Sequence, residues 1–141
     1  MGGGISPALN HSLTLTTEQM QEMIDHASEH APLEACGILA GKNRKVHKVI
    51  RMRNQAQSPV RYLMAPADQL EAFNWMDSNG LELIGIFHSH PRGPETVSPT
   101  DIAEAAYAVV HVILACLVTE WRMRGFWIEN GTYHEVPLHI I

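Results

Sequence analysis

Two imidazoles stand at the end of an apolar run, in the segment GIFHSHP at residues 85–91. In a β-strand the side chains at positions i and i+2 share a face, so His88 and His90 would point the same way and could bind one ion. Zinc suits such a pair, because neutral imidazole nitrogen binds zinc at about 2.0–2.1 Å. Pro91 is expected to end the strand at these ligands. The spacing therefore predicts a metal site at a strand end.

A carboxylate follows eleven residues after His90, in the segment SPTD at residues 98–101. This order is typical of a helix start, with Ser98 at the N-cap, proline at the first helical position and Asp101 at the third. Taken alone, the pattern indicates capping before it indicates metal binding. The two interpretations are compatible, because a short loop can bring the helix start beside the strand end. Three protein ligands with a fourth position left to water are the pattern of catalytic zinc.

A hydrolytic zinc site also needs a base that takes a proton from the zinc-bound water and passes it to the leaving amine. Glu34 is the candidate for this general base. It stands where an expected helix has ended and an expected buried strand, residues 35–40, begins. The alternative is a solvated carboxylate with no catalytic role, which is common at such junctions.

Together these residues resemble the signature of the JAMM (MPN-plus) metallopeptidases. That signature is an upstream glutamate followed by His-x-His-Pro, seven residues, serine, two residues and aspartate. Glu34 matches the glutamate, residues 88–91 match the histidine pair and proline, and Ser98 and Asp101 match the final pair. The resemblance covers roughly residues 13–137, and six chemically distinct positions agree in order and spacing.

The resemblance implies an α/β (α+β) domain with a curved mixed sheet flanked by helices. It also implies a zinc hydrolase that cleaves isopeptide or peptide bonds after the C-terminal glycine tail of ubiquitin-like proteins. By matching positions, His88, His90 and Asp101 are the expected zinc ligands, Glu34 is the expected acid/base, and Ser98 is expected to steady the tetrahedral oxyanion.

The chain is similar to the small prokaryotic members of this family, because it has little room for the long insertions that grip ubiquitin. The expected partner is therefore a ubiquitin-like or sulfur-carrier protein, whose extended tail would suit recognition by strand addition. The sequence does not choose among such substrates, between isopeptide and linear bonds, or among oligomeric states.

Other sequence patterns were considered as signs of other functions, and the first is a second possible metal motif. The segment HASEH at residues 26–30 spells the inverted zincin motif, and helical spacing would place His26 and His30 on one face. Only this pentapeptide resembles the inverted zincins, and it lies at the end of a helix. A chance match is easy in a chain with nine histidines. Zinc deaminases carry a His-x-Glu and a P-C-x-x-C element, neither of which is present. A non-catalytic scaffold domain of the same fold is the alternative to an enzyme, although such domains typically lack the ligands.

Hydrophobic periodicity and turn residues predict a mixed order of helices and strands. Thr16 and Gln19 have capping-box spacing before the first helix, and Asn130-Gly131 is typical of a type I′ hairpin turn. The expected helices are 17–29, 66–78 and 98–107. The buried side of the second is expected to carry Leu70 and Phe73, with Met76 and Trp75 as further candidates. The expected strands are 35–41, 46–52, 62–64, 81–88, 109–118, 123–129 and 132–137.

Length and composition predict one globular domain. Residues 1–12 are expected to be a flexible N-terminal segment and residues 13–141 the folded domain. Apolar residues make up 45% of the chain and the formal net charge is −5, with dispersed basic residues that argue against nucleic-acid binding. Two cysteines and no apolar run of membrane-spanning length favour a cytoplasmic protein without membrane association.

Overall fold

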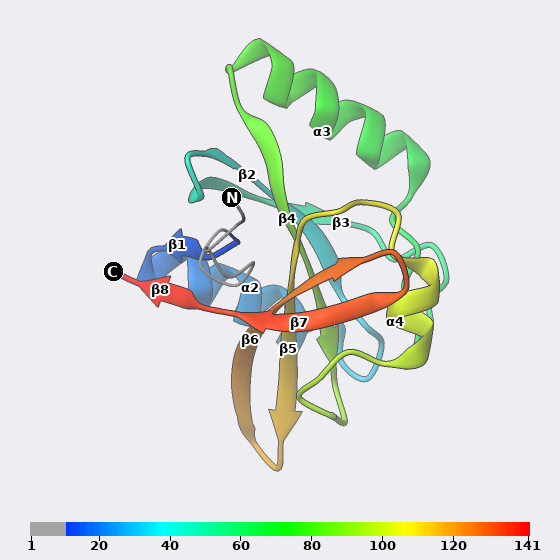
Figure 1. Ribbon diagram of the computed structural model, residues 1–141. Coiled ribbons are helices and arrows are strands. Elements are labelled where there is room, and N and C mark those ends of the chain that lie inside the picture. The colour runs from blue at the N-terminus through cyan, green and yellow to red at the C-terminus, as the bar shows by residue number, and fades with distance from the viewer. Residues whose placement is uncertain (1–10) are drawn as a thin grey trace.

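A single curved sheet of eight strands forms the framework of the protein, in the order β7-β6-β5-β4-β2-β3-β1-β8 (Figure 1). The computed structural model describes residues 11–141, so most of the expected flexible segment, residues 1–12, lies outside the described residues. The strands are β1 (Leu13–Leu15), β2 (Cys36–Lys42), β3 (Lys45–Met52), β4 (Glu82–His90), β5 (Val110–Leu117), β6 (Glu120–Glu129), β7 (Thr132–Val136) and β8 (Leu138–Ile140). The helices are α2 (Thr17–His30), α3 (Pro66–Ser78) and α4 (Pro99–Glu104).

Strand β4 lies in the middle of the sheet and runs antiparallel to β2 but parallel to β5. A parallel pair needs a crossover connection, and here that crossover contains α4. The same crossover brings the start of α4 back to the carboxyl end of β4. Sheet topology thus places the two chemically interesting segments of the sequence next to each other.

Two hairpins have turn residues with positive φ angles, and the sequence predicted the turn type of one of them, Asn130-Gly131. Asn130 and Gly131 have φ angles of 53° and 75°, the positive values of a type I′ turn between β6 and β7. Asn43 and Arg44 have φ angles of 54° and 60° in the turn between β2 and β3. Both turns match the right-handed twist of their strands, so they fix the register of the pairs that they join.

The long helices cover opposite faces of the sheet. Met23 of α2 packs in a cluster with Leu39 and Phe87, whereas Met76 of α3 packs with the neighbouring strand residue Ile38. Successive strand residues point to opposite faces, so the two clusters lie on the two sides of β2 and β4. Figure 1 shows α3 at the upper edge of the view, away from α2. No helix in residues 11–141 is long and apolar enough to cross a bilayer.

Most of the expected helices and strands are confirmed, with ends that differ by up to three residues. Helix α4 ends at Glu104, because Ala105 is already extended and the chain must enter β5 at Val110, so the expected helix over 98–107 is too long. The expected strand at 62–64 is only an isolated bridge between Asn54 and Met64. Leu70 was expected on the buried side of its helix, but it is 65% exposed.

A further difference is the pair β1 and β8, which the sequence did not predict. Each has three residues, too few to show a periodic pattern. They run parallel, with Leu13 opposite Leu138, and the amide of Leu13 also donates to the carbonyl of Pro137. This pairing joins the two ends of the described chain and ends the sheet next to β3.

Candidate metal centre

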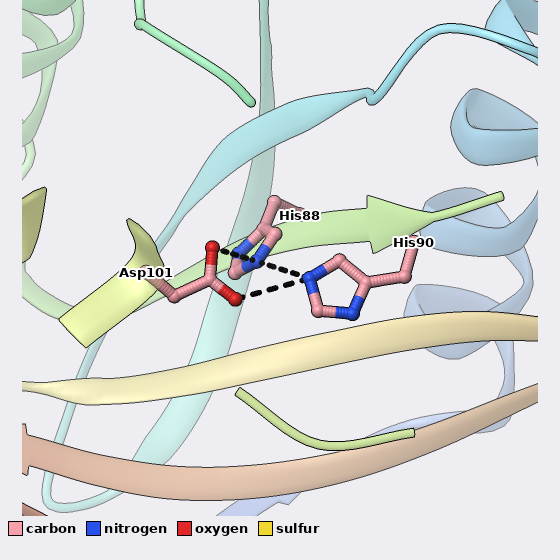
Figure 2. Close-up of side chains that lie close together, drawn as sticks. All are labelled: His88, His90 and Asp101. Carbon is pink, nitrogen blue, oxygen red and sulfur yellow. Dashed lines mark hydrogen bonds and ion pairs between the residues drawn. The ribbon is translucent and has the colours of Figure 1, made fainter. Parts of the chain in front are cut away.

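His88 and His90 lie at the C-terminal end of β4, in the middle of the sheet. The structure keeps both residues inside β4, which ends two residues beyond the expected end at His88, and both rings point to one face. His88 is opposite Cys36 of β2 and Ile113 of β5, and His90 is opposite Ala115 of β5. The backbone of the candidate ligands is therefore fixed by neighbouring strands. Figure 2 shows the two rings turned toward Asp101, which comes from the start of α4.

The three side chains converge on one point. The Nε2 atoms of His88 and His90 are 3.2 Å apart, and they lie 3.1 Å and 3.0 Å from the two carboxylate oxygens of Asp101. Ligands at about 2.0–2.1 Å in a tetrahedron would be about 3.3 Å apart. The donor set and its spacing thus fit a tetrahedral cation. Within residues 11–141 this is the only group of three or more potential ligands that lies close enough to share an ion.

The second nitrogen of His90 determines which nitrogen faces the ion. Its Nδ1 lies 2.8 Å from the carbonyl oxygen of Pro94 and donates its proton there. The Nε2 lone pair of the neutral ring is then free for a metal, an arrangement common among metal-binding histidines. Nδ1 of His88 is buried and has no hydrogen-bond partner in the described part of the chain, but the ring stacks on Tyr62 at a centroid distance of 4.6 Å. One ring is oriented by a hydrogen bond and the other by packing.

The charges of the three groups suit cation binding. Burial lowers the pKa of His88, so this imidazole is neutral at pH 7. Burial also lowers the pKa of His90, but hydrogen bonds with Asp101 and Pro94 outweigh it and raise the pKa overall. Burial opposes ionisation of Asp101, yet hydrogen bonds from the two histidines hold its pKa well below its usual range. Two imidazole nitrogens beside an ionised carboxylate are thus a suitable set of ligands for a divalent cation.

Asp101 is the third residue of α4, where it completes a capping box with Ser98, and its carboxylate also points into the cluster. The Ser98 hydroxyl oxygen accepts a hydrogen bond from the Asp101 amide at 3.0 Å, and the Ser98 amide donates to the Asp101 carboxylate at 2.9 Å. This capping box fixes the carboxylate at the beginning of α4. Both interpretations of the segment SPTD are thus compatible in one geometry: the cap holds the same side chain that faces the two imidazoles.

Glu34 lies beside this cluster. Its side chain is buried, its Oε1 has no hydrogen-bond partner among residues 11–141, and burial raises the pKa of its carboxyl to about 8. Glu34, His90 and Ser98 line one cleft of about 190 Å³, whose other walls include Pro59 and Gly93. The structure therefore brings the five candidate site residues of the motif close together, with His90 shared by the cluster of ligands and the cleft. An unpaired buried carboxyl is costly, so its position calls for a partner or a function.

The inverted zincin motif does not form such a cluster. Nε2 of His26 is bonded to the carbonyl of Cys36 at 2.9 Å, and Nδ1 of His30 is bonded to the carbonyl of His26 at 2.9 Å. Glu29 pairs with Arg51 on the surface. These side chains fasten α2 to the sheet and to its own last turn, which accounts for them without a metal.

Sequence reasoning missed residues that support the site. Ser89 stands between the two histidines and points the other way, and its hydroxyl oxygen accepts a hydrogen bond from the Ala35 amide at 2.8 Å. Strand alternation would have indicated that Ser89 faces away from the metal, but not its partner. Nothing in the sequence marked Tyr62 or the carbonyl of Pro94, because both come from loops whose course depends on the complete fold.

Comparison with known proteins agrees with this geometry. The family described as prokaryotic homologs of the JAB domain matches residues 16–128. The probable TtuB-protein conjugate cleaving protease of Thermus thermophilus is 39% identical over 143 residues, which cover 99% of this chain and 92% of that protein. The CysO-cysteine peptidase of Mycobacterium tuberculosis is 28% identical, over 92% of this chain and 91% of the relative.

A solved structure supports the same relationship. The solution structure of a protein from Desulfitobacterium hafniense has a TM-score of 0.84 at 33% identity and covers 92% of each chain. The family match spans more than half of the sequence and includes every residue of the candidate site. The chain therefore belongs to the prokaryotic JAB-domain branch of the JAMM (MPN-plus) family, among whose members are the two peptidases named above.

Proposed function

We propose that this protein is a zinc peptidase that hydrolyses the amide bond after the C-terminal glycine tail of a ubiquitin-like or sulfur-carrier protein. The observation that carries the proposal is the convergence of His88, His90 and Asp101, together with the position of His90 in the wall of the cleft that Glu34 and Ser98 also line. Such a cleft joins a cation site to a buried carboxyl and a hydroxyl, which are the groups that amide hydrolysis needs.

His88, His90 and Asp101 would hold the zinc ion through two imidazole nitrogens and one carboxylate. Two nitrogens and one oxygen leave a fourth tetrahedral position open, as in catalytic rather than structural zinc sites. When bound, zinc acts as a Lewis acid and makes a water molecule acidic enough to ionise near neutral pH. The two free thiols, Cys36 and Cys116, do not belong to this set, and their unpaired state supports a cytoplasmic location.

Glu34 is the proposed general base and acid. Its carboxylate takes a proton from the attacking water and then delivers it to the nitrogen of the leaving amine, so one group serves both halves of the reaction. Burial favours the protonated form of Glu34 and keeps its pKa high enough to return the proton. The carboxyl oxygen without a partner, Oε1, is available for this exchange.

Ser98 is the proposed oxyanion donor. Its oxygen already accepts the hydrogen bond from the Asp101 amide, but a hydroxyl can accept and donate at once. The hydroxyl proton is therefore free to donate to the negative charge that develops on the substrate carbonyl oxygen. The capping bond holds the hydroxyl in place at the cleft wall, so little reorganisation is needed during the reaction.

The shape of the cleft favours a glycine tail. Its walls include Pro59, Val60, Gly93 and Pro94, and its volume of about 190 Å³ is small. A narrow cleft between prolines accepts an extended backbone without side chains better than bulky residues. The names of the two relatives describe a protein conjugate in one case and a cysteine adduct in the other. Isopeptide and α-peptide leaving groups are both compatible with a site that recognises the tail.

A three-substrate assay tests the proposal. A ubiquitin-fold protein ending in Gly-Gly would be joined to a lysine side chain of a peptide, to the α-amine of a peptide, or to the α-amine of cysteine. Release of the intact carrier should be observed for at least one of them, and the preferred leaving group should show the greatest kcat/KM. A protein that contains zinc but cleaves none of these substrates, while binding the carrier, would be a scaffold domain instead.

Removal of the metal should abolish this hydrolysis reversibly. Dialysis against a strong chelator is expected to lower the rate to the uncatalysed background, and one equivalent of zinc should restore it, because the three ligands remain in place. Metal content by mass spectrometry and the rate of carrier release would be measured on the same samples. Full activity in the metal-free sample would contradict the proposal.

Replacement of Ser98 by alanine should lower kcat about a hundredfold, since loss of an oxyanion donor typically costs this much. The change also removes the N-cap of α4, which costs about 1 kcal/mol of stability. Thr16→Ala is the matched control, because Thr16 caps α2 through the same capping box but lies outside the cleft. Both variants should unfold at slightly lower temperature, and only Ser98→Ala should lose turnover. Equal activities of the two variants would exclude a catalytic role for Ser98.

A further inference from the structure

Glu34 is positioned by a loop rather than by the sheet. Strand β2 begins at Cys36, so Glu34 precedes the hydrogen-bonded ladder. Its amide donates to the carbonyl of Ser58 at 2.9 Å, and its carbonyl accepts a hydrogen bond from the Asn54 side chain at 3.0 Å. Both partners belong to the connection between β3 and α3, residues 53–65. The position of the proposed base therefore depends on how that loop is folded.

The side-chain amide of Asn54 holds the loop through four hydrogen bonds. Its amide nitrogen donates to the carbonyls of Glu34 and Arg61, each at 3.0 Å. Its amide oxygen accepts from the backbone nitrogens of Ala56 and Leu63, each at 3.0 Å. An asparagine amide has two donor protons and two acceptor lone pairs, so no capacity is left unused. One side chain thus closes the loop on itself and fastens it to Glu34.

The same loop forms one wall of the cleft. Pro59 and Val60 line it together with Glu34 and His90, and Val60 is 72% exposed. An apolar side chain this exposed at the mouth of a cleft is available to a substrate. A tail that enters the cleft would therefore contact the segment whose two ends Asn54 holds.

The loop is also attached to the helix that carries Asp101. Arg61 forms a two-pronged ion pair with Glu104 of α4, with N···O distances of 2.8–3.1 Å. This pair is on the surface and contributes little to stability, but its geometry orients the loop relative to α4. Asn54 joins the loop to the base, and Arg61 joins it to the helix of a metal ligand.

We propose that Asn54 is a positioning residue that couples the cleft wall to the base Glu34, an inference that rests on the proposed peptidase function. Contact of the substrate tail with Pro59 and Val60 fixes the conformation of the loop. The hydrogen bond from the Asn54 amide then fixes the position of the Glu34 backbone. Asn54 touches neither substrate nor metal. Its loss therefore affects both substrate binding, through the wall, and turnover, through the position of the carboxylate.

Asn54→Asp isolates this role. Aspartate has nearly the same shape and keeps the one oxygen that accepts from Ala56 and Leu63, but its second oxygen replaces the amide nitrogen, so both donor protons are lost, including the one that binds the Glu34 carbonyl. We expect kcat to fall about 10–100-fold, since displacement of a reacting group by about 1 Å can cost a hundredfold, and KM to rise severalfold. Zinc content should stay at one per chain. The substrate is the carrier with an isopeptide-linked fluorescent lysine peptide, or the preferred leaving group of the three.

Asn79→Asp is the matched control. The Asn79 amide donates to the carbonyl of Trp75 at 2.8 Å, just beyond the end of α3, so this change also removes an amide donor from a backbone carbonyl. Asn79 does not line the cleft, and its kcat and KM should stay within twofold of wild type. Asn54→Ser is a neutral second variant, whose shorter side chain can still cap the turn at Ala56 but cannot reach Glu34. It should show the same loss if Asn54→Asp is unstable.

A double-mutant cycle with Glu34→Gln decides whether the effect passes through the base. If Asn54 acts by placing Glu34, adding Asn54→Asp to Glu34→Gln should lower the residual kcat less than threefold but still weaken substrate binding. Unchanged kcat in Asn54→Asp, or full additivity in the cycle, would overturn the inference while leaving the peptidase function intact. Absence of hydrolysis by the wild-type protein would instead reject the proposed function.

Discussion

Replacement of His88 by alanine should leave the protein without bound zinc and without measurable hydrolysis. His88 is fully buried at the centre of the sheet, where a lost imidazole nitrogen cannot be replaced by another side chain without rearrangement of β4. Two ligands remain, His90 and Asp101, and two ligands do not hold zinc in a catalytic site at cellular concentrations. Metal content after dialysis should fall from one zinc per chain to near zero.

His26→Ala is the matched control for this experiment. His26 is also a buried histidine whose ring nitrogen bonds to a backbone carbonyl, that of Cys36, and it belongs to the inverted zincin motif. The change should cost about 1–3 kcal/mol of stability, because it leaves a buried carbonyl unpaired, but it should not change the zinc content. A stoichiometric zinc content in His88→Ala, or loss of zinc in His26→Ala, would contradict the assignment of the metal site.

Glu34→Gln should retain zinc but lose about 10²–10⁴-fold in kcat, the usual contribution of a general acid/base. Glutamine keeps the size and one oxygen of glutamate but cannot carry the proton from water to the leaving amine. Three ligands remain untouched, so the metal content should not change. Carrier release and bound zinc, measured on the same preparation, separate this variant from His88→Ala.

The pH dependence provides a second readout for Glu34. The base form exists above its pKa, which burial raises to about 8, and a bound cation favours the carboxylate and moves that pKa downward. In the wild-type protein kcat/KM should therefore rise with pH until Glu34 is ionised, at a pH below 8. The residual activity of Glu34→Gln should lack this rise. Glu29→Gln, a surface variant of the inverted zincin motif, should keep both rate and pH profile, and retained activity in Glu34→Gln would refute its catalytic role.

The local parts of the site were predictable because their geometry depends on few residues. The two histidines share a face by strand alternation, and the Ser98–Asp101 capping box follows from spacing alone. The positive φ angles at Asn130 and Gly131 likewise depend only on the turn type. Each of these patterns is set within four consecutive residues, so the fold does not need to be known.

The structural features that the sequence did not predict depend on residues far apart along the chain. Strands β1 and β8 pair residues more than a hundred positions apart, and neither has a pattern of its own. The hydrogen bonds of Asn54 could not be anticipated, since they depend on the loop path between β3 and α3. Leu70 was placed inside by hydrophobicity but is exposed, whereas Met76 is buried as expected and Ala72 is buried without having been expected there. Hydrophobic type alone does not say which stripe of a helix meets the sheet.

The different anchoring of the ligands and of the base has an evolutionary consequence. His88 lies on a strand that is paired on both sides, whereas Glu34 depends on a connection whose residues 55–63 are mostly surface positions. Substitutions in that connection can reshape the entrance for a different carrier without disturbing the cation-binding residues. New substrate preferences can thus arise by drift in one short segment, provided that Asn54, just before that segment, is retained.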